Sequence, residues 1–519
     1  MRRTLSFVVV LAVLAWSTGV GAQSLAQGPF KRLVIRGATV IDGTGAPPQR
    51  PIDIVVEGDR ITEVTLVGND FGRVEERRRP KAGDFELDAT GMYLMPGFVN
   101  AHVHINGEKA ALPATYSYYL WLAHGVTTVL EAGSGNGLEW TVEQRDAAAR
   151  HEIIAPRIFA YVRPGMSFGR RVTSPEIARE WVQAVAKKGA DGLKLSAHRP
   201  DIMAALIDEA HKQGIRTTAH LAQSGVAQMN ALDAARLGLD SLQHWYGLAE
   251  AMLAGRSIPD WRLNHNHNNE QDRFSDAGRF WAQAAEPGSA QWNALLEELL
   301  DLEFPIVPTS SAYEFLRDRS RVHGAEWHAA YSSPGMLDYW TPNPDNHGSL
   351  YFSWTTQDET NWYHFFYKWQ KFVNEYKNRG GRVAVGADEG SGGSLYGFGY
   401  IREFELLQQA GFHPLEVIRA ATLRGAEVVG AADQLGTVDV GKIADFVIVD
   451  QNPLEDFKVL YGTGALRYDP ATGRSGQVGG VKYTVKDGIV YDARGLLKEV
   501  ARMVSEAKRK TTSSPGARH

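Results

Sequence analysis

The chain has 519 residues, 44% hydrophobic and 22% charged, which is an ordinary composition for a globular protein in water. The length exceeds one minimal domain and fits a large barrel with a smaller companion domain. The formal net charge is -5 without a long run of either sign, which argues against nucleic acid and anionic membranes as partners. We expect a small-molecule substrate, and homo-oligomer formation stays open. Cysteine is absent, so disulfides are excluded and any metal must be held by nitrogen and oxygen ligands.

The first 22 residues have the pattern of a signal peptide. Arg2 and Arg3 precede an apolar stretch at residues 5–16, and small residues at 20–22 give the usual cleavage spacing. Twelve residues are too few to cross roughly 30 Å of hydrocarbon at about 1.5 Å per residue. We therefore expect an exported protein, periplasmic or secreted, without stable membrane insertion after cleavage. An uncleaved membrane anchor is the alternative.

Both ends of the remaining chain are rich in β-branched residues. Residues 32–42 and 53–64 read as strands, and so do residues 444–450 and 481–492 near the other end. Gly58-Asp59 and Asp487-Gly488 are typical hairpin turns. These segments predict one small β-sandwich made of residues 23–95 and 425–495. Residues 496–519 are expected to form a C-terminal helix and a tail, disordered from Lys508 because apolar residues are lacking there.

The middle of the chain, residues 96–424, alternates short apolar strands with amphipathic helices, which predicts an α/β fold with parallel βαβ units. Ser174 and Pro175 are an N-cap and a first helical residue, and this helix should run to Lys188. The next two helices are predicted at residues 200–214 and 225–238. Eight strands are predicted, at residues 96–104, 126–133, 157–162, 192–196, 216–221, 241–245, 304–311 and 382–388.

The spacing of three polar residues supports a (β/α)₈ TIM-like barrel. Lys194, His220 and His244 lie near the ends of successive strands, 26 and then 24 residues apart. A barrel of eight units needs about 25–30 residues per unit. Regularity is lost in an aromatic-rich insertion at about residues 246–360. Such an insertion forms either a lid and substrate pocket or an oligomer interface and plain packing, and the sequence favours neither.

The pattern His-x-His occurs twice, in two different settings. His102 and His104 end a predicted strand, where alternation directs both imidazoles to the same side, into the barrel. His265 and His267 have the same spacing in an Asn-rich loop with no strand before it, so metal binding is not expected there.

Four more candidate ligands stand at the C-terminal ends of their own predicted strands. They are Lys194, His220, His244 and Asp388. Active sites of this barrel collect residues from those ends, so the constellation carries more weight than any member. Imidazole and carboxylate ligands suit zinc best, while manganese, cobalt and nickel also fit.

Four segments together resemble the amidohydrolase superfamily. They are PGFVNAHVH, HGVTTVLEAG, SLQHWYG and ATLRGAEVVGAADQLGTVDVGKIADFVIVDQNP, and the likeness is to the imidazolonepropionase-like and prolidase-like (Xaa-Pro dipeptidase-like) binuclear branch. The resemblance implies two divalent ions, most simply Zn²⁺. His102, His104 and Asp388 would hold the first ion, and His220 and His244 the second. Lys194, carboxylated by CO₂, would bridge them. The alternative for Lys194 is an interior cation paired with a carboxylate, or a mononuclear site.

The chemistry implied is hydrolysis of an amide C–N bond in a dipeptide or an N-acyl amino acid-like substrate by metal-activated hydroxide. Asp388 is the candidate general base. Tyr246 and His198 are candidates for stabilising the oxyanion, with a supporting or surface role as the alternative. Arg163 is a candidate for binding a substrate carboxylate, with a rim salt bridge as the alternative.

Three other functions were weighed against this one. Residues 165–169 match the G-x-S-x-G motif of serine hydrolases, but no helix starts directly after Ser167 as that motif needs. A single-ion cyclic-amide hydrolase or deaminase, or a lactonase, would use the same fold. A barrel that has lost catalysis is disfavoured because all six metal-site positions carry competent residues.

Overall fold

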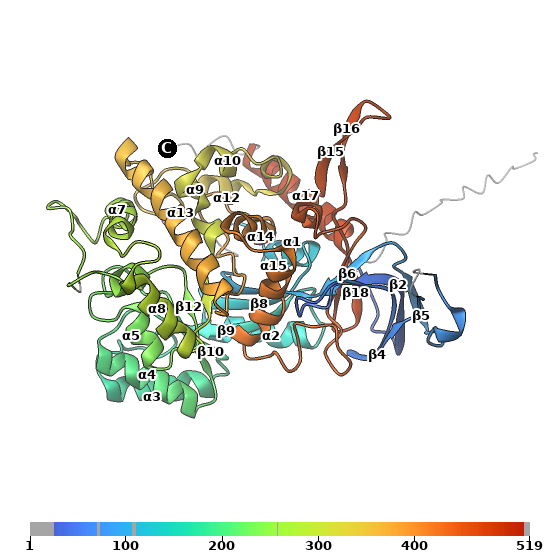
Figure 1. The fold of residues 1–519 in the computed structure, drawn as a ribbon, viewed down its shortest axis with the longest axis horizontal. Coiled ribbons are helices and arrows are strands. Elements are labelled where there is room, and N and C mark those ends of the chain that lie inside the picture. Colours follow the sequence, from blue (N-terminus) through green and yellow to red (C-terminus); the bar gives the residue numbers. More distant parts are fainter. Residues whose placement is uncertain (1–24, 70–72, 106–110, 257, 513–519) are drawn as a thin grey trace, which may run out of the picture.

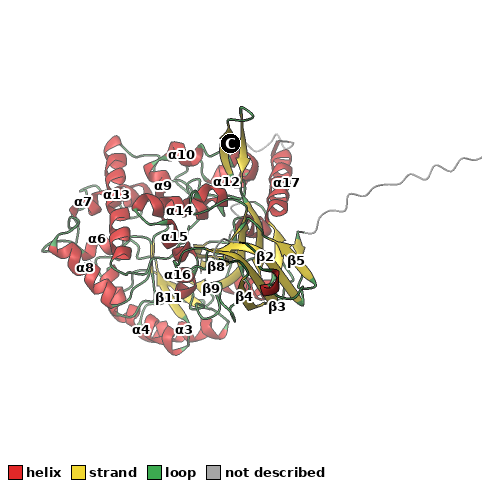
Figure 2. Ribbon diagram, turned by 45° about the vertical axis from the view of Figure 1, so that its right-hand side comes forward, coloured by secondary structure: helices red, strands yellow, loops and turns green. Residues whose placement is uncertain are grey.

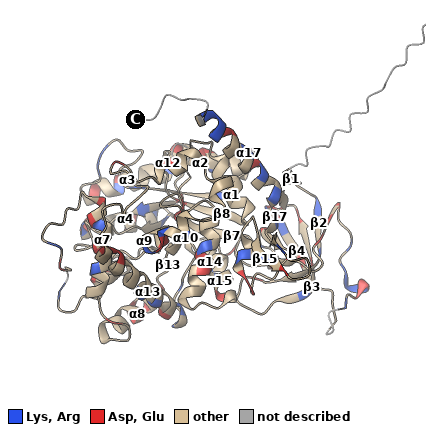
Figure 3. Ribbon diagram, turned by 90° about the horizontal axis from the view of Figure 1, so that it is seen from above, with Lys and Arg blue, Asp and Glu red and all other residues tan. Residues whose placement is uncertain are grey.

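The computed structural model describes residues 25–69, 73–105, 111–256 and 258–512 (Figure 1). The expected signal peptide lies outside the described residues. Figure 2 shows two parts, with helices surrounding a parallel sheet on one side and a β-rich domain on the other. Basic residues (Lys and Arg) and acidic residues (Asp and Glu) are interspersed in both parts (Figure 3). Among the described residues, none of the helices has the length and apolar character needed to cross a membrane.

The β-rich domain is one nine-stranded sheet built from both chain ends, as the sequence predicts. Its order is β1-β18-β17-β14-β6-β2-β3-β4, with β5 paired to β2. The pairings are antiparallel except those of β2 with β5 and β6. Residues Leu33, Ile54 and Phe446 lie in its apolar core. The strands are β1 (Ala26–Gln27), β2 (Arg32–Val40), β3 (Gln49–Glu57), β4 (Arg60–Leu66), β5 (Phe85–Asp88), β6 (Tyr93–Pro96), β14 (Phe446–Val449), β17 (Val481–Lys486) and β18 (Ile489–Asp492).

The chain end differs from expectation because helix α17 (Ala493–Thr512) continues past Lys508. Val500 and Val504 are buried on this helix, and their packing anchors the turns that follow. The tail predicted to be disordered is therefore helical as far as Thr512. A two-stranded hairpin of β15 (Ala465–Asp469) and β16 (Arg474–Val478) projects from this side of the molecule (Figure 1). Short 3₁₀ helices η1 and η2 occupy Glu76–Arg78 and Phe457–Leu460.

The second sheet is the barrel, with seven parallel strands in the order β13-β12-β11-β10-β9-β8-β7. The strands are β7 (Phe98–Val103), β8 (Val126–Gly133), β9 (Arg157–Val162), β10 (Gly192–Leu195), β11 (Arg216–Ala219), β12 (Leu242–Gln243) and β13 (Ile306–Val307). Each is preceded or followed by helices on the outer surface, as a TIM-like barrel requires.

The predicted eighth strand closes the ring but is not a regular strand. Residue Val383 forms a parallel bridge with Ile306, and the amide of Ala101 donates to the carbonyl of Val385 at 3.0 Å. The chain passes so close to β7 that a Cβ at Gly386 would lie 2.9 Å from the Cβ of His102. Asp388 then takes a left-handed φ of 46°. This close approach and the left-handed residue interrupt the extended geometry that the sequence predicts.

Ser174 caps helix α3 as predicted, but a later helix is shorter than predicted. Helix α5 covers only Ala231–Arg236, and residues 225–229 form turns. Asn230 and Asp233 make a capping box, which starts the helix there because the Asn230 side chain takes up a free amide. The outer helices include α1 (Thr115–Ala123), α2 (Leu138–Ala149), α3 (Pro175–Lys187), α4 (Pro200–Lys212), α14 (Phe398–Ala410), α15 (Pro414–Ala421) and α16 (Leu423–Val428).

The aromatic-rich insertion is helical, and its residues divide between interior packing and the wall of a cavity. Trp281 and Trp292 in the insertion, and Trp362 and Trp369 on the helix that continues beyond it, are fully buried and pack the helices together. Other insertion residues line the cavity described below. Its helices are α6 (Leu248–Ala251), α7 (Glu270–Gln283), α8 (Ala290–Asp301), α9 (Ser310–Arg317), α10 (Arg319–His323), α11 (His328–Tyr331), α12 (Pro334–Tyr339) and α13 (Thr356–Asn378).

Candidate metal centre

A cavity of about 850 Å³ opens at the C-terminal ends of the barrel strands. One side of its wall is polar and comes from the strand ends and the loops after them. The opposite side comes from helices α7 and α9 and the segment between α12 and α13. The lining residues include His102, His104, Arg163, Lys194, His198, His220, Phe274, Tyr313, Phe315, Leu350 and Asp388.

Three predicted ligands form a compact group at the floor of this cavity. One ligand atom from each of His102, His244 and Asp388 lies within 4.8 Å of the others. The Asp388 carboxylate is 3.5 Å from His102 Nε2 and 3.7 Å from His244 Nε2. His104 Nε2 approaches the same carboxylate at 3.3 Å. Residues from β7, the end of β12 and the closing segment therefore meet at one carboxylate.

Neighbouring side chains fix which ring nitrogen of each histidine faces the group. His102 Nδ1 donates to Gln243 Oε1 at 2.8 Å. His244 Nδ1 lies 2.5 Å from Thr309 Oγ1, and this hydroxyl already donates to the Pro308 carbonyl, so the imidazole must be the donor. Nε2 of both rings is left with a free lone pair. His244 Nε2 is buried without a hydrogen-bond partner among the described residues.

The electrostatics keep these groups in the forms that bind cations. Burial sets the pKa of His102 and His244 well below the ordinary value, so both imidazoles are neutral at pH 7. Burial opposes ionisation of Asp388, but interactions with His102 and His104 outweigh it and hold that pKa well below its usual range. The orphaned nitrogen, neutral imidazoles and ionised carboxylate fit a divalent transition metal.

Lys194 lies beside this group at the end of β10. Its Nζ is 3.3 Å from His102 Nε2, and its side chain is buried. Burial, with the charge of Arg163 nearby, sets the Lys194 pKa well below its usual value. This downward shift favours the uncharged amine, which is the form that reacts with CO₂.

His220 adjoins the compact group without being part of it. Its ring centroid is 4.6 Å from that of His244, and burial also holds its pKa well below normal. The His220 ring also stacks on that of Tyr246, with the two centroids 4.3 Å apart. The structure therefore gathers all six predicted ligands at one end of the barrel, with His220 at the edge.

Sequence reasoning missed Glu131, at the end of β8. Its carboxylate lies 3.6 Å from His104 Nδ1 and accepts a hydrogen bond from the Ile105 amide. Burial lowers the His104 pKa, but Asp388 and Glu131 outweigh it, so the net shift is upward. Glu131 lies two residues before the end of the segment VTTVLEAG, near the C-terminal end of its strand like the other candidates, and this position was the available signal.

Strained backbone also marks the site. His244, Thr309 and Asp388 have left-handed φ values of 67°, 55° and 46°. Such conformations are uncommon for residues other than glycine and cluster at functional sites. The strain at Thr309 places its hydroxyl against His244.

Tyr246 does not face the cavity as predicted. It is buried behind His220, and its hydroxyl lies 3.0 Å from that of Tyr313. Tyr313, from α9 in the insertion, lines the cavity in its place. The sequence could not reveal this because Tyr313 follows β13 by several residues and has no motif around it.

The other two predicted wall residues do line the cavity. His198 Nε2 is buried without a hydrogen-bond partner among the described residues. Arg163 is exposed and packs over Gly133, where a Cβ would lie 2.5 Å from its Nε. No ion pair of Arg163 occurs in the described part of the chain, in contrast to the rim salt bridge considered above. Ser167, the serine of the esterase-like motif, donates a hydrogen bond to Glu139 and has no histidine partner among the described residues.

Comparison with known proteins decides the family. The model of the Amidohydrolase family matches residues 93–255 and 369–490, together more than half of the chain. The chain belongs to the amidohydrolase family. The gap between the two matched parts falls on the insertion. Members of this family generally use divalent metal ions, act on small-molecule substrates and hydrolyse C–N bonds.

Two relatives and one solved structure are similar to this chain. N-acyl-D-aspartate deacylase of Alcaligenes xylosoxydans xylosoxydans is 34% identical over 113 residues, 22% of this chain and 19% of that protein. Adenine deaminase 2 of Rhizobium etli is 27% identical over 258 residues, 47% of this chain and 41% of that protein. These matches span less than half of either relative. A Xaa-Pro dipeptidase structure with bound methionine shares the fold at TM-score 0.59 and 20% identity, covering 89% of this chain and 100% of that one.

Proposed function

We propose that this amidohydrolase cleaves an amide C–N bond in a dipeptide or an N-acyl amino acid-like substrate. The observation that carries the proposal is the buried group of His102, His244 and Asp388, with Lys194 beside it, at the floor of a large cavity. His102, His104 and Asp388 would hold one ion, and His220 and His244 a second. A carboxylated Lys194 would bridge the two. Zinc suits this donor set best.

Bound ions would supply a hydroxide from water near neutral pH and would polarise the scissile carbonyl. The protein's own residues supply the proton transfers. Asp388 is ionised and faces the cavity, so it takes the proton from the attacking water and returns it to the leaving amine. Both transfers occur at one carboxylate, which is the only acidic side chain at the centre of the compact ligand group.

Tyr313 is the residue that we assign to the developing oxyanion. Its ring is 5.4 Å from that of His244, and it lines the cavity. Burial raises the Tyr313 pKa well above normal, so the hydroxyl keeps its proton and can donate a hydrogen bond. Tyr246 behind it fixes the direction of that hydroxyl, because the two oxygens are 3.0 Å apart.

The cavity has two chemically different walls, which orient a substrate. Arg163 and His198 lie on the β9–β10 side, where a guanidinium that has no ion-pair partner among the described residues can bind the carboxylate of an amino acid. Phe274, Phe315 and Leu350 from the insertion lie on the other side and suit an apolar acyl group or side chain. The substrate would therefore lie across the ligand group with its carboxylate toward Arg163.

A single-ion cyclic-amide hydrolase or deaminase is the second candidate. The compact group contains three residues, and three protein ligands are enough for one catalytic ion. Metal analysis of unstripped protein separates the two proposals, because the first expects two ions per chain and the second expects one.

Activity is tested on a panel of N-acyl amino acids and dipeptides, with adenine and cyclic amides in parallel. Turnover of carboxylate-bearing amides, lost with chelator and restored with Zn²⁺, is the expected result. Hydrolysis of only the ring substrates by a one-metal protein would overturn the proposal. We also propose export to the periplasm or medium, which N-terminal sequencing of the mature protein from each fraction tests.

A further inference from the structure

A second pair of histidines lies in the loop that leads into helix α7. His265 Nε2 and His267 Nδ1 are 3.3 Å apart, and the two rings are nearly perpendicular. The sequence alone argued against metal binding here because no strand precedes the pair. The structure adds the surrounding side chains, which the sequence pattern could not show.

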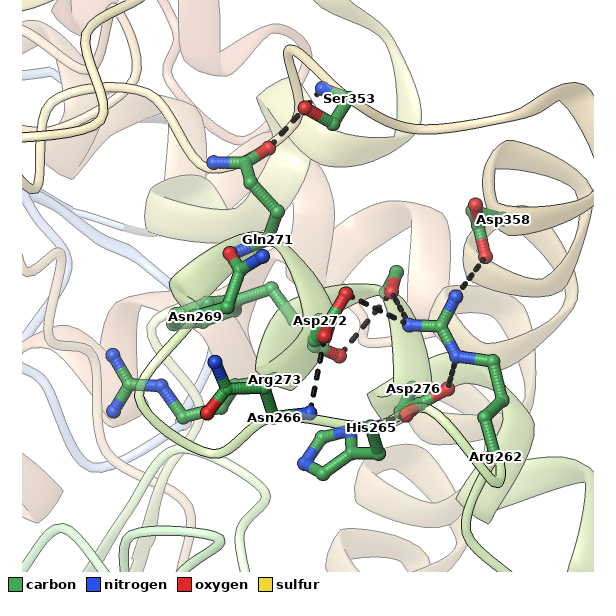
Figure 4. Close-up of polar contacts among 12 residues, drawn as sticks. Arg262, His265, Asn266, Asn269, Gln271, Asp272, Arg273, Asp276, Ser353 and Asp358 are labelled. Atoms are coloured by element: carbon green, nitrogen blue, oxygen red, sulfur yellow. Dashed lines mark hydrogen bonds and ion pairs between the residues drawn. The ribbon is translucent and has the colours of Figure 1, made fainter.

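The first of these is Asp276, which orients His265 (Figure 4). His265 Nδ1 donates to Asp276 Oδ2 at 2.5 Å, and Asp276 is completely buried. Its other oxygen lies 2.7 Å from Arg262 Nε, and Arg262 in turn reaches toward Asp272 and Asp358. The Asp276 oxygen accepts this hydrogen bond from Nδ1–H of His265, so Nε2 is the ring nitrogen that faces His267 and is placed to bind a cation.

The second is Trp261, which packs against both imidazoles. Its ring centroid is 4.3 Å from that of His265 and 4.6 Å from that of His267. The His265 side chain is nearly buried, whereas His267 is exposed. The two rings are thus held in place before any ligand arrives, which reduces the entropy that binding costs.

We propose that His265 and His267 form a binding site for a divalent transition metal, with Asp276 as the carboxylate that orients His265. Two imidazole nitrogens on a tetrahedral zinc, with Zn–N of about 2.0–2.1 Å, are separated by about 3.4 Å. A carboxylate behind a metal-bound imidazole is the usual supporting arrangement. His267 moves its proton from Nδ1 to the exposed Nε2, so no net proton is lost, and water completes the coordination. Imidazole ligands favour Cu²⁺, Ni²⁺ and Zn²⁺.

The position of the pair gives such a site a structural role. Asn269 caps α7 immediately after the pair, and Phe274 on the same helix lines the active-site cavity. A cation bound by His265 and His267 would fix the loop at the start of α7 and so stiffen this wall. The inference does not rest on the proposed hydrolysis.

The test uses His267→Ala, because His267 is exposed, whereas a change at His265 would also disturb buried Asp276. The matched control is His364→Ala, an exposed histidine on α13. Protein first saturated with Zn²⁺ at the barrel site is titrated with Cu²⁺ and followed by electron paramagnetic resonance. We expect wild type and His364→Ala to bind one nitrogen-ligated Cu²⁺ that His267→Ala binds at least tenfold more weakly. Superimposable titrations of wild type and His267→Ala would overturn the site, while leaving hydrolysis by the barrel unaffected.

Discussion

The hydroxyl oxygens of Tyr246 and Tyr313 are 3.0 Å apart, and the two residues come from different parts of the chain. Tyr246 lies two residues after the candidate ligand His244, whereas Tyr313 belongs to helix α9 in the insertion. The pair joins the insertion to the barrel mouth at the ligand group. The insertion thus contributes a hydrogen-bond donor as well as an apolar wall.

Replacing Tyr313 with phenylalanine should lower kcat by roughly 10²–10³-fold with little change in KM, since the lost hydrogen bond acts in the transition state. Tyr246→Phe leaves the cavity wall in place and should cost about 10-fold, the effect of a supporting partner. Steady-state kinetics on the best amide substrate measure both. Equal kcat values in Tyr313→Phe and wild type would remove Tyr313 from the mechanism. Thermal unfolding of each variant controls for lost packing.

Lys194→Ala should remove one of two ions and lower activity by roughly 10³-fold, because several kcal/mol of metal-supplied stabilisation disappears. Added short carboxylates should restore part of the rate by replacing a carbamate. Lys188→Ala is the matched control, since Lys188 is on the surface and pairs with Glu139. Metal content and rate are measured together. If Lys194→Ala keeps two ions and full activity, the bridging role is wrong.

The positions of the six candidate ligands were predictable because each lies near the end of an apolar strand, and barrel topology brings strand ends together. The residues that hydrogen-bond to these candidate ligands could not be predicted from the sequence. Gln243 and Thr309 touch ligands from strands that are distant in sequence, and neither residue type signals such a role. Tyr313 depends on how the insertion folds back over the mouth. The eighth strand was predicted by its apolar pattern, but its close approach at Gly386 is a tertiary effect that no local pattern encodes.

Arg163→Gln should raise KM for carboxylate-bearing substrates by roughly 10- to 100-fold, since hydrogen bonds to a charged group contribute about 1.5–3 kcal/mol. The same substrates with an amidated carboxyl should be hydrolysed equally by variant and wild type. Gly133→Ala should have a similar, smaller effect because its Cβ would displace Arg163. Kinetics on the paired substrates measure this. A KM increase for both members of a pair would refute carboxylate binding by Arg163.

Glu250 should make the protein less stable as pH rises. Burial raises the Glu250 pKa from 4.5 to about 7. Between these values the folded chain keeps a proton that the unfolded chain has lost, so the free energy of unfolding falls as pH increases and levels off above about 7. The fall amounts to about 3 kcal/mol at most. Glu250→Gln removes this titrating carboxyl group and so the loss of stability that comes with its ionisation. The variant should therefore gain stability relative to wild type at pH 8 and not at pH 4.5. Urea unfolding at both pH values measures this, and parallel pH profiles would contradict it.

Arg157 connects the barrel to the β-rich domain, and its removal should destabilise both. It begins β9, lies 2.7 Å from Asp445 and also pairs with Asp487 in the turn before β18. Both carboxylates are largely buried, and Lys486 still pairs with Asp487, so Arg157→Ala leaves Asp445 as the carboxylate without a cationic partner among the described residues. Removing one partner of such a group costs about 3–5 kcal/mol. Arg150→Ala is the control, because Arg150 pairs with Glu152 in solvent and should cost little. Thermal unfolding of the two variants should differ in Tm by several degrees. Arg157 lies at the end of the barrel opposite the ligand group, so the kinetic constants of the folded Arg157→Ala variant should stay at wild-type values. If Arg157→Ala has the same Tm as Arg150→Ala, the two domains are held together by other contacts.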